Sequence, residues 1–225
     1  MGRLAVYALI LAAIAGAAYL AFAYIPAQTI DDTQQSPLEI STRSIVEEGD
    51  HHSILVRYPS FGLNEFDNAI DIAVQELAKE VRDQATEDKP GTQGFRKYEL
   101  VGGYEDTYAD ATHASVRLQL SEDFGGAHPL AIIRAFNFDR QLQKVMGLDD
   151  ALALIGLSLE QVAAEAKREL DRQLGDDVIS PEGADPKPEN YQTFLLSESA
   201  ITFIFQPYQV APYAAGAPEV SFPRR

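Results

Sequence analysis

The run SVRLQLSEDFGGAHPLAIIRAFNFD, residues 115–139, contains the clearest strand pattern in the chain. Val116, Leu118 and Leu120 alternate with polar residues, which is the period of two that a half-buried strand requires. Residues 130–139 are rich in β-branched and aromatic side chains, and the glycines and proline that precede them are turn residues. The run therefore predicts two strands that pair as a hairpin or as near neighbours.

The chain before this run predicts a strand, a long helix and further strands. Residues 52–58 alternate apolar and polar side chains, as a strand does, and Asn64 is a candidate cap for the helix that follows. The helix is indicated by apolar residues at spacings of three and four, namely Phe66, Ile70, Ala73, Leu77 and Val81. Residues 95–108 then predict two short strands around Gly102 and Gly103.

The chain after this run predicts a second helix and a second group of strands. Ser158 and Gln161 form a capping-box pattern at the start of that helix, and Gly175 is suited to end it. After a proline-rich loop, residues 201–205 predict a buried strand, and residues 220–223 return to strand-like alternation. Strands thus lie before and after two main helices instead of alternating with them, which is typical of the α+β class.

We therefore expect an α+β fold of two small packed subdomains, with antiparallel sheets and two main helices. The N-terminal companion subdomain is expected at residues 51–120 and the second subdomain at residues 121–225. Residues 26–50 are polar, contain two prolines and lack a sustained period, so they are expected to form a tether that ends at most in an edge strand. Residues 1–25 contain an apolar segment.

This apolar segment, residues 4–25, reads LAVYALILAAIAGAAYLAFAYI and contains no charged side chain. At a rise of about 1.5 Å per residue, such a helix covers a hydrocarbon core of about 30 Å, so we expect it to span a lipid bilayer. Arg3 precedes it and two aspartates follow it, which predicts a cytoplasmic N-terminus, an uncleaved signal anchor in the cell membrane and an extracytoplasmic domain. The alternative is a signal peptide cleaved near Ala23, which would release the domain.

The composition limits the classes of partner. The 225 residues carry 34 acidic and 18 basic side chains, a formal net charge of -16, so nucleic acid or an anionic lipid surface would be repelled. This charge favours a cationic partner, although an acidic surface that merely keeps the domain soluble would have the same charge. The chain has no cysteine, which excludes disulfides, thiolate metal sites and thiol nucleophiles.

The sequence contains no motif typical of catalysis or of a metal site. The four histidines are His51, His52, His113 and His128. They lack the spacing of a helix-borne metal site, and the motifs of serine hydrolases, phosphate-binding loops and dinucleotide-binding loops are missing. Asp149 and Asp150 are adjacent, but neighbouring side chains point in different directions, so we interpret such acid pairs as solvated. We expect no cofactor, no metal and no catalytic residue.

Two loops are candidates for ligand binding. Gly125, Gly126 and His128 combine backbone freedom with an imidazole, and the alternative is a turn of special geometry whose histidine bonds local carbonyl groups. Tyr208 and Tyr213 lie beside prolines that deny hydrogen bonds to a strand ladder. They are expected on a corner near the domain rim, and the alternative is that both rings pack inward. These five residues are the predicted ligand contacts.

Three stretches carry a family resemblance: FGGAHP at residues 124–129, FIFQPYQVAPYAAGAPEVSFP at residues 203–223, and VRYPSFG at residues 56–62. They resemble the RsiV-like family of exported domains, over residues 51–225. The resemblance implies two α+β subdomains, the second of them RsiV-like, that face the cell envelope. Domains of this family occur in lysozyme-sensing anti-sigma factors and beside peptidoglycan deacetylase domains. Since only three residues precede the apolar segment, we expect no anti-sigma segment here, and we expect no deacetylase domain.

The leading hypothesis is a membrane-anchored binding module that contacts a cationic lysozyme-like protein or peptidoglycan through the two loops. A second hypothesis is an enzyme that modifies cell-wall glycan, with His128 and a nearby carboxylate as acid and base. A third is a structural role in which the domain pairs with another exported protein. We expect binding without catalysis, because no second essential group can be named beside His128.

Overall fold

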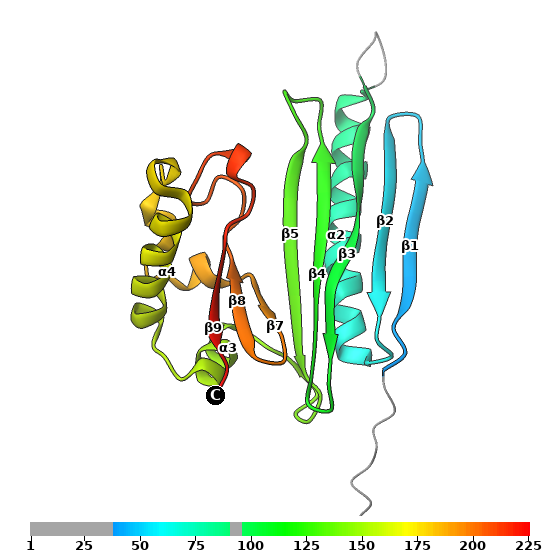
Figure 1. Cartoon of the computed structure of the whole chain (residues 1–225). Coiled ribbons are helices and arrows are strands. Elements are labelled where there is room, and N and C mark those ends of the chain that lie inside the picture. The colour runs from blue at the N-terminus through cyan, green and yellow to red at the C-terminus, as the bar shows by residue number, and fades with distance from the viewer. Residues whose placement is uncertain (1–37, 91–95) are drawn as a thin grey trace, which may run out of the picture. The chain divides into compact units, whose positions relative to one another are not determined.

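The computed structural model describes residues 38–90 and 96–225, which belong to one compact unit (Figure 1). Two sheets and three α-helices are described, and they confirm the α+β class. The apolar segment at residues 4–25 lies outside the described residues. Among those that are described, no helix is both long enough and apolar enough to cross a membrane.

The first sheet has six strands that follow one another in chain order. They are β1 (Ser41–Glu48), β2 (His52–Ser60), β3 (Tyr98–Ala109), β4 (His113–Asp123), β5 (Leu130–Asp139) and β6 (Lys144–Val145). The predicted hairpin of β4 and β5 is confirmed. The prediction of purely antiparallel sheets is wrong, because β2 and β3 are parallel. Between them α2 (Asn64–Asp88) returns the chain to the end of the sheet where β2 begins.

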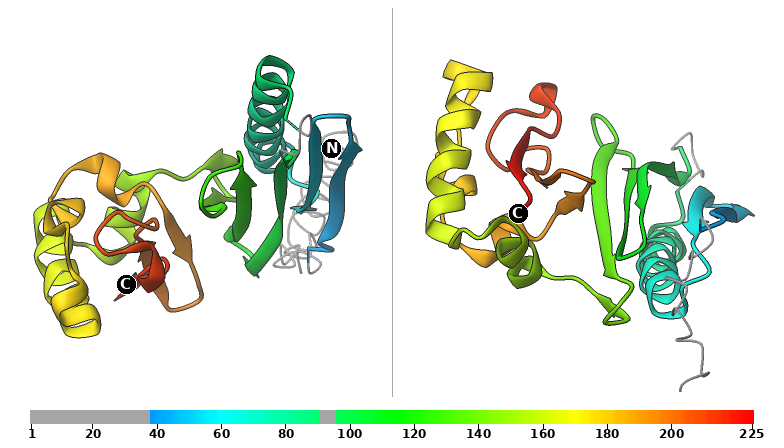
Figure 2. Two further views of the ribbon diagram at one scale, coloured as in Figure 1. Left: turned by 90° about the horizontal axis from the view of Figure 1, so that it is seen from above. Right: turned by 60° about the horizontal axis from the view of Figure 1, so that its bottom comes forward.

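One face of this sheet is covered by α2, as Figures 1 and 2 show. The buried side chains of α2 are Phe66, Asp67, Ile70, Val74, Leu77, Ala78, Val81 and Ala85. The apolar ones, except Ala85, share a core with alternate strand residues such as Ile54, Val56, Leu118 and Leu120. The predicted apolar helix face is confirmed, except that Val74 is buried in place of Ala73, which is half-buried.

The start of α2 differs from the prediction. Leu63 is the N-cap residue, and neither it nor Asn64 supplies a side-chain cap. The buried carboxylate of Asp67 instead accepts hydrogen bonds from the backbone N–H groups of Phe61 at 2.7 Å and Gly62 at 2.9 Å. An acid in the first helical turn thus holds the turn between β2 and α2, where a cap at the helix start was predicted.

The third strand is continuous where two short strands were predicted. It passes through Gly102, where β4 comes so close that a Cβ atom would lie 2.4 Å from the carbonyl oxygen of Gln119. Only glycine allows that approach of two backbones. The register shifts between Glu105 and Tyr108, and Asp106 in this irregular segment has a φ of 49°.

The second sheet is antiparallel and contains β7 (Phe194–Leu196), β8 (Ala200–Ile204) and β9 (Glu219–Pro223). The other elements of this half are α3 (Leu148–Ile155), α4 (Leu159–Leu174) and the 3-10 helices η1 (Gly175–Asp177), η2 (Pro181–Ala184), η3 (Pro188–Tyr191) and η4 (Tyr213–Ala215). They share a second hydrophobic core, which begins at Met146. The predicted capping box of Ser158 and Gln161 is confirmed, as is the end of α4 at Gly175.

The two halves meet where β5 packs against β7. Ile133, Leu195 and Ile204 form a small third core between the sheets. Buried Asn137 on β5 donates to the carbonyl of Phe194 at 2.7 Å, and its side-chain oxygen accepts from the N–H of Leu196 at 3.0 Å. Apolar burial and paired polar groups therefore both hold the sheets together.

The expected segment boundaries do not coincide with the packing. The division at residue 120 falls inside β4, and β5 and β6 continue the first sheet to Val145. The edge strand in which the expected tether at residues 26–50 could end is present as β1, of which only Ile45 is buried. The sequence pattern is weak there because an edge strand buries few side chains, so its apolar alternation is incomplete.

Candidate functional site

Three of the predicted site residues form one aromatic cluster. His128 lies in the turn from β4 to β5, whereas Tyr208 and Tyr213 lie between β8 and β9. The ring centroids of His128 and Tyr213 are 4.3 Å apart, and those of Tyr208 and Tyr213 are 5.4 Å apart. Ring pairs at such distances attract one another. The fold thus joins two loops that are 80 positions apart in the chain.

Hydrogen bonds define the tautomer of His128. Its Nδ1 atom lies 2.8 Å from the carbonyl oxygen of Pro129, which can only accept, so Nδ1 carries a proton. Its Nε2 atom lies 3.1 Å from the hydroxyl of Tyr208, which can donate or accept. The hydroxyl of Tyr213 donates to the same Pro129 carbonyl at 3.0 Å. The alternative in which His128 bonds a local carbonyl is confirmed, and its ring also bridges the two loops.

Tyr208 has a backbone conformation that usually requires glycine. Its φ is 70°, and it is the third residue of a turn in which the N–H of Gln209 donates to the carbonyl of Gln206 at 2.9 Å. Pro207 in second place and a positive φ in third place describe a type II turn. A tyrosine there costs about 1–2 kcal/mol, and its side chain is exposed. Backbone strain that presents an exposed ring supports a functional role.

The two predicted glycines contribute differently to the turn before His128. Gly125 has a φ of 77°, and its N–H donates to the carboxylate of Asp123 at 2.8 Å. A Cβ atom on Gly126 would lie 3.8 Å from the carbonyl oxygen of His128, an ordinary contact distance. The turn therefore requires glycine at position 125, whereas the space at position 126 would accept a side chain.

A hollow of about 320 Å³ lies beside the aromatic cluster, against the face of the first sheet that α2 does not cover. Its lining residues are Arg117, Gln119, Ala131, Ile133, Pro207, Tyr213, Gly216 and Ala217. A second hollow of about 380 Å³ is lined by Asp106, Thr107, Tyr108, Arg117, Leu195, Leu196, Ser197, Thr202 and Glu219. Arg117 lines both. We call the two hollows, with Arg117 between them, the cleft.

Arg117 is the central charge of the cleft. Its guanidinium lies 2.6 Å from the carboxylate of Glu219 on β9 and 3.1 Å from that of Asp106 on β3. The N–H at Nε is buried and is not aligned for a hydrogen bond, although Asp106 is near it. One base between two acids leaves this part of the cleft with a net negative charge. The ion pair of Arg117 with Glu219 also connects the two sheets.

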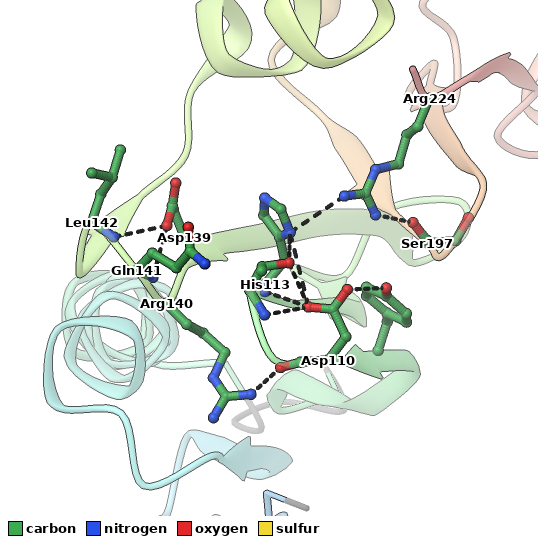
Figure 3. A network of polar contacts seen from close by, with 10 residues as sticks. Asp110, His113, Asp139, Arg140, Gln141, Leu142, Ser197 and Arg224 are labelled. Atoms are coloured by element: carbon green, nitrogen blue, oxygen red, sulfur yellow. Dashed lines mark hydrogen bonds and ion pairs between the residues drawn. The ribbon is translucent and has the colours of Figure 1, made fainter. Parts of the chain in front are cut away.

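A polar network lies at the end of the cleft formed by Tyr108 and Ser197 (Figure 3). Asp110 accepts hydrogen bonds from the hydroxyl of Tyr108 at 2.5 Å and from the backbone N–H groups of Thr112 at 2.7 Å and His113 at 2.6 Å. Burial alone would raise the pKa of Asp110, but these donors outweigh it and lower the pKa to about 2.

His113 connects this network to the C-terminus. Its Nδ1 atom lies 3.3 Å from Nη2 of Arg224, which can only donate, so Nδ1 is an acceptor and His113 is neutral. Burial and the nearby Arg224 charge both lower the pKa of His113. Arg224 also donates to the carbonyl of Ser197 at 2.6 Å. These contacts connect the turn before β4 and the turn after β7 to the C-terminus.

The remaining histidines are dispersed. His51 contacts the carbonyl of Pro90 through Nδ1 at 2.6 Å, and His52 lies 3.6 Å from the carboxylate of Glu47. Within residues 38–90 and 96–225, no three His, Asp or Glu side chains are grouped as metal ligands. The described part of the chain therefore offers no built metal site.

The sequence prediction missed the centre of the cleft. Arg117 is predicted only as a polar position of β4, and Glu219 and Asp106 are not predicted as site residues. The available signal was that Arg117 is the lone basic residue on the polar face of the best-predicted strand. Its importance depends on which strands of the second sheet pack opposite it, and the alternation of one strand does not contain that information.

The fold and the cleft define a class of protein: a two-sheet α+β domain whose loops and sheets enclose a binding-sized cleft. Residues 152–225 match the family described as "Protein of unknown function (DUF3298)". A crystal structure of a DUF3298 family protein from Pseudomonas aeruginosa PAO1 superposes with a TM-score of 0.58 at 17% identity, over 84% of this chain and 91% of that one. That likeness shows a shared fold.

Two curated proteins are also similar. The peptidoglycan-N-acetylmuramic acid deacetylase PdaC of Bacillus subtilis is 28% identical over 185 residues, which are 80% of this chain and 38% of PdaC. The esterase Rv3036c of Mycobacterium tuberculosis is 30% identical over 112 residues, 49% of this chain and 48% of the esterase. The chain thus spans less than half the length of each. Residues 152–225 thus match the DUF3298 model, and one relative is by its name a peptidoglycan deacetylase, while the RsiV-like resemblance stays a prediction.

Proposed function

We propose that this protein is a binding module of the cell envelope that recognises a cell-wall-related ligand in the cleft and does not catalyse a reaction. The observation that carries the proposal is Tyr208. Its exposed ring is held in a glycine-type backbone conformation and contacts the rings of His128 and Tyr213, and Tyr213 lines the cleft. Glycine would relieve the positive φ there, so the tyrosine ring is kept at a cost in backbone conformational energy.

Two ligand classes fit the cleft and its surroundings. The carboxylates beside Arg117 and the net charge of -16 support a cationic, lysozyme-like protein as ligand. The aromatic cluster beside a cleft lined by both polar and apolar residues supports peptidoglycan, and PdaC is by its name a peptidoglycan deacetylase. We propose the cell wall as the common context of both.

A binding role suits His128 better than an acid–base role. Both ring nitrogens have partners, the carbonyl of Pro129 and the hydroxyl of Tyr208, and neither partner is a carboxylate. A general base needs a nitrogen within reach of the proton that it removes, and often a carboxylate that orients the ring. The similarity to a deacetylase and an esterase keeps the enzymatic alternative open to a direct test.

The proposed location is outside the cell membrane, with residues 4–25 as the anchor. The support is the length and apolar character of that segment, the charges on either side of it and the relation of the domain to cell-wall-associated proteins. Protease added to intact spheroplasts should degrade the domain. Protection of the domain while a periplasmic-side control is cut would contradict this orientation.

Binding can be tested with the full chain in mild detergent. We expect it to sediment with insoluble peptidoglycan or to bind lysozyme in a calorimeter, and we expect Tyr208→Gly to weaken binding at least about tenfold, since an aromatic contact residue often contributes 1–2 kcal/mol or more. The control is Leu142→Ala, which removes another exposed apolar side chain from a turn outside the cleft.

Three outcomes would contradict the proposal. One is failure of the wild-type chain to bind either ligand. Another is binding that Tyr208→Gly and Leu142→Ala change equally. The third is a change in the masses of muropeptides that depends on the protein and is lost in His128→Ala, which would establish an enzyme in place of a binding module.

A further inference from the structure

The first sheet ends in a strand whose outer side has no partner among the described residues. β1 pairs with β2 alone and lies at the far end of the sheet from β5 and β6 (Figures 1 and 2). Its eight residues, Ser41–Glu48, pair in continuous register without a bulge and include no proline. Bulges and prolines are devices that usually protect such an edge, and β1 has neither.

The opposite edge of the same sheet is closed. The side-chain amide of Gln206 donates to the carbonyl of Ile133 at 2.9 Å, and its oxygen accepts from the N–H of Ile133 at 3.2 Å. Gln206 thus satisfies the outward backbone groups of β5 as a neighbouring strand would. β6 and β7 cover further parts of that edge. Among the described residues, therefore, one edge of the sheet is closed and the other has no partner strand.

We propose that β1 pairs antiparallel with β1 of a second copy of the chain, about a two-fold axis at Ile45. In this register Arg43 lies opposite the partner's Glu47, and Ser44 lies opposite the partner's Val46. A two-fold axis places each of these pairs in the interface twice. Each Arg43 then faces a Glu47 of opposite charge on the other copy, because Arg43 comes before Ile45 in the strand and Glu47 comes after it.

Charged residues of α2 lie beside Arg43 and Glu47 and alternate with them in sign. Arg43 lies 4.0 Å from Asp71, and Glu47 accepts a hydrogen bond from Arg82 at 3.0 Å, both partners being on α2. A pair between Arg43 and the partner's Glu47 would complete a row of alternating charges across the axis. In a chain of charge -16, most surfaces of two copies repel one another, so a strand that carries both signs is a favourable place for contact.

An apolar strip on the other face of the sheet ends at the same edge. Val46, Leu55 and Val101 are in register across β1, β2 and β3, with 72%, 43% and 38% of their surfaces exposed. Val46 is the outermost and the most exposed of the three. The proposed pairing places a second copy of β1 beside it and brings the two strips together, which buries apolar surface.

Disulfide trapping can test the register, because the chain has no native cysteine. Antiparallel neighbours have Cα atoms about 4.5–5.5 Å apart, a separation that a disulfide can bridge. We expect differently tagged Ser44→Cys and Val46→Cys chains, mixed as full-length protein in detergent, to form a mixed disulfide in higher yield than either chain with itself. Preferential self-linkage of Leu55→Cys would instead show face-to-face packing and overturn the proposal.

Analytical ultracentrifugation can test the association itself. We expect a concentration-dependent dimer that Val46→Lys weakens at least about tenfold, since each dimer contains two such positions and charged edges oppose pairing. Val101→Lys is the matched control on the same strip, two strands inward, and should leave a dimer. A monomer at all concentrations, or equal effects of both variants, would overturn the proposal whatever the result of the ligand tests.

Discussion

The two ends of β4 each have a histidine and a carboxyl group nearby, and they differ in how these groups are bonded. At the first end, Asp110 has several donors and His113 is enclosed by the network of Figure 3. At the far end, Glu122 is buried with Oε1 lacking a hydrogen bond among the described residues, and His128 lies in an exposed turn. At the first end Asp110 and His113 have their hydrogen-bond partners, whereas the second end retains strain and exposed rings.

We interpret the first end of β4 as a region that stabilises the fold and the far end as a region that serves recognition. Groups that have all their hydrogen bonds stabilise a fold, while strained or exposed groups reduce stability and persist where they serve another purpose. We therefore expect changes at the first end of β4 to lower the free energy of unfolding, and changes at the far end to leave it equal or raise it. Four measurements, given from the largest expected effect to the smallest, test whether the two ends differ in this way.

The largest effect is expected for Asp110→Ala. It leaves the N–H groups of Thr112 and His113 without their acceptor, which should lower the free energy of unfolding by about 2–3 kcal/mol. Urea unfolding at pH 7 measures it. Asp176→Ala, an exposed acid at the end of α4, is the control and should change stability by less than about 0.5 kcal/mol. Equal effects would show that the network contributes little.

The second prediction concerns pH. The folded pKa of Asp110 is about 2, below the usual value of 3.8, so its ionised form stabilises the fold above pH 3.8 and that contribution is lost as the pH falls towards 2. Allowing for solvent screening of a partly exposed group, Asp110→Asn should be about 1–2 kcal/mol less stable than wild type at pH 7. The gap should narrow below pH 4. A gap independent of pH would contradict the assigned hydrogen bonds.

The third prediction has the opposite sign. Burial and the nearby charge of Glu80 raise the pKa of Glu122, so its contribution to stability is complete below pH 4.5 and is lost as the pH rises through the folded value. Glu122→Gln should therefore be more stable than wild type at pH 7, by about 1 kcal/mol, with no gain at pH 4. Thermal melts at both pH values measure this. A destabilised variant at pH 7 would show that the ionised carboxylate has an unseen partner.

The smallest effect is expected for Tyr208→Gly. Glycine relieves the positive φ, while loss of the ring removes its contacts with His128 and Tyr213, so the two changes should nearly cancel to within about 1 kcal/mol. Tyr208→Ala keeps the strain and loses the ring, so it should melt below Tyr208→Gly. If Tyr208→Ala melted at a higher temperature than Tyr208→Gly, the backbone at position 208 would not be strained, and the argument from strain to recognition would fail.

Much of the fold was predictable because its signals are local. The β4–β5 hairpin follows from alternation and turn residues, and α4 begins at Ser158 and ends at Gly175, as its capping residues predict. Two local predictions failed, one within the first turn of α2 and one where another strand intervened. Asn64 does not cap α2, because Asp67 satisfies the preceding backbone, and β3 is not divided at Gly102, because β4 needs that space.

The sequence by itself determined the α+β class, the apolar faces of the helices and the two loops that contain His128, Tyr208 and Tyr213. These properties depend on spacing and backbone preference within a few residues. Only the tertiary structure decided that the three rings stack, that Arg117 lies between Asp106 and Glu219, and that β2 and β3 are parallel. The ring cluster and the ion pair with Glu219 depend on how two separate hydrophobic cores pack against each other, and the parallel pair depends on the path of α2 between β2 and β3. Contacts between distant segments are not recorded in the periodicity of either segment.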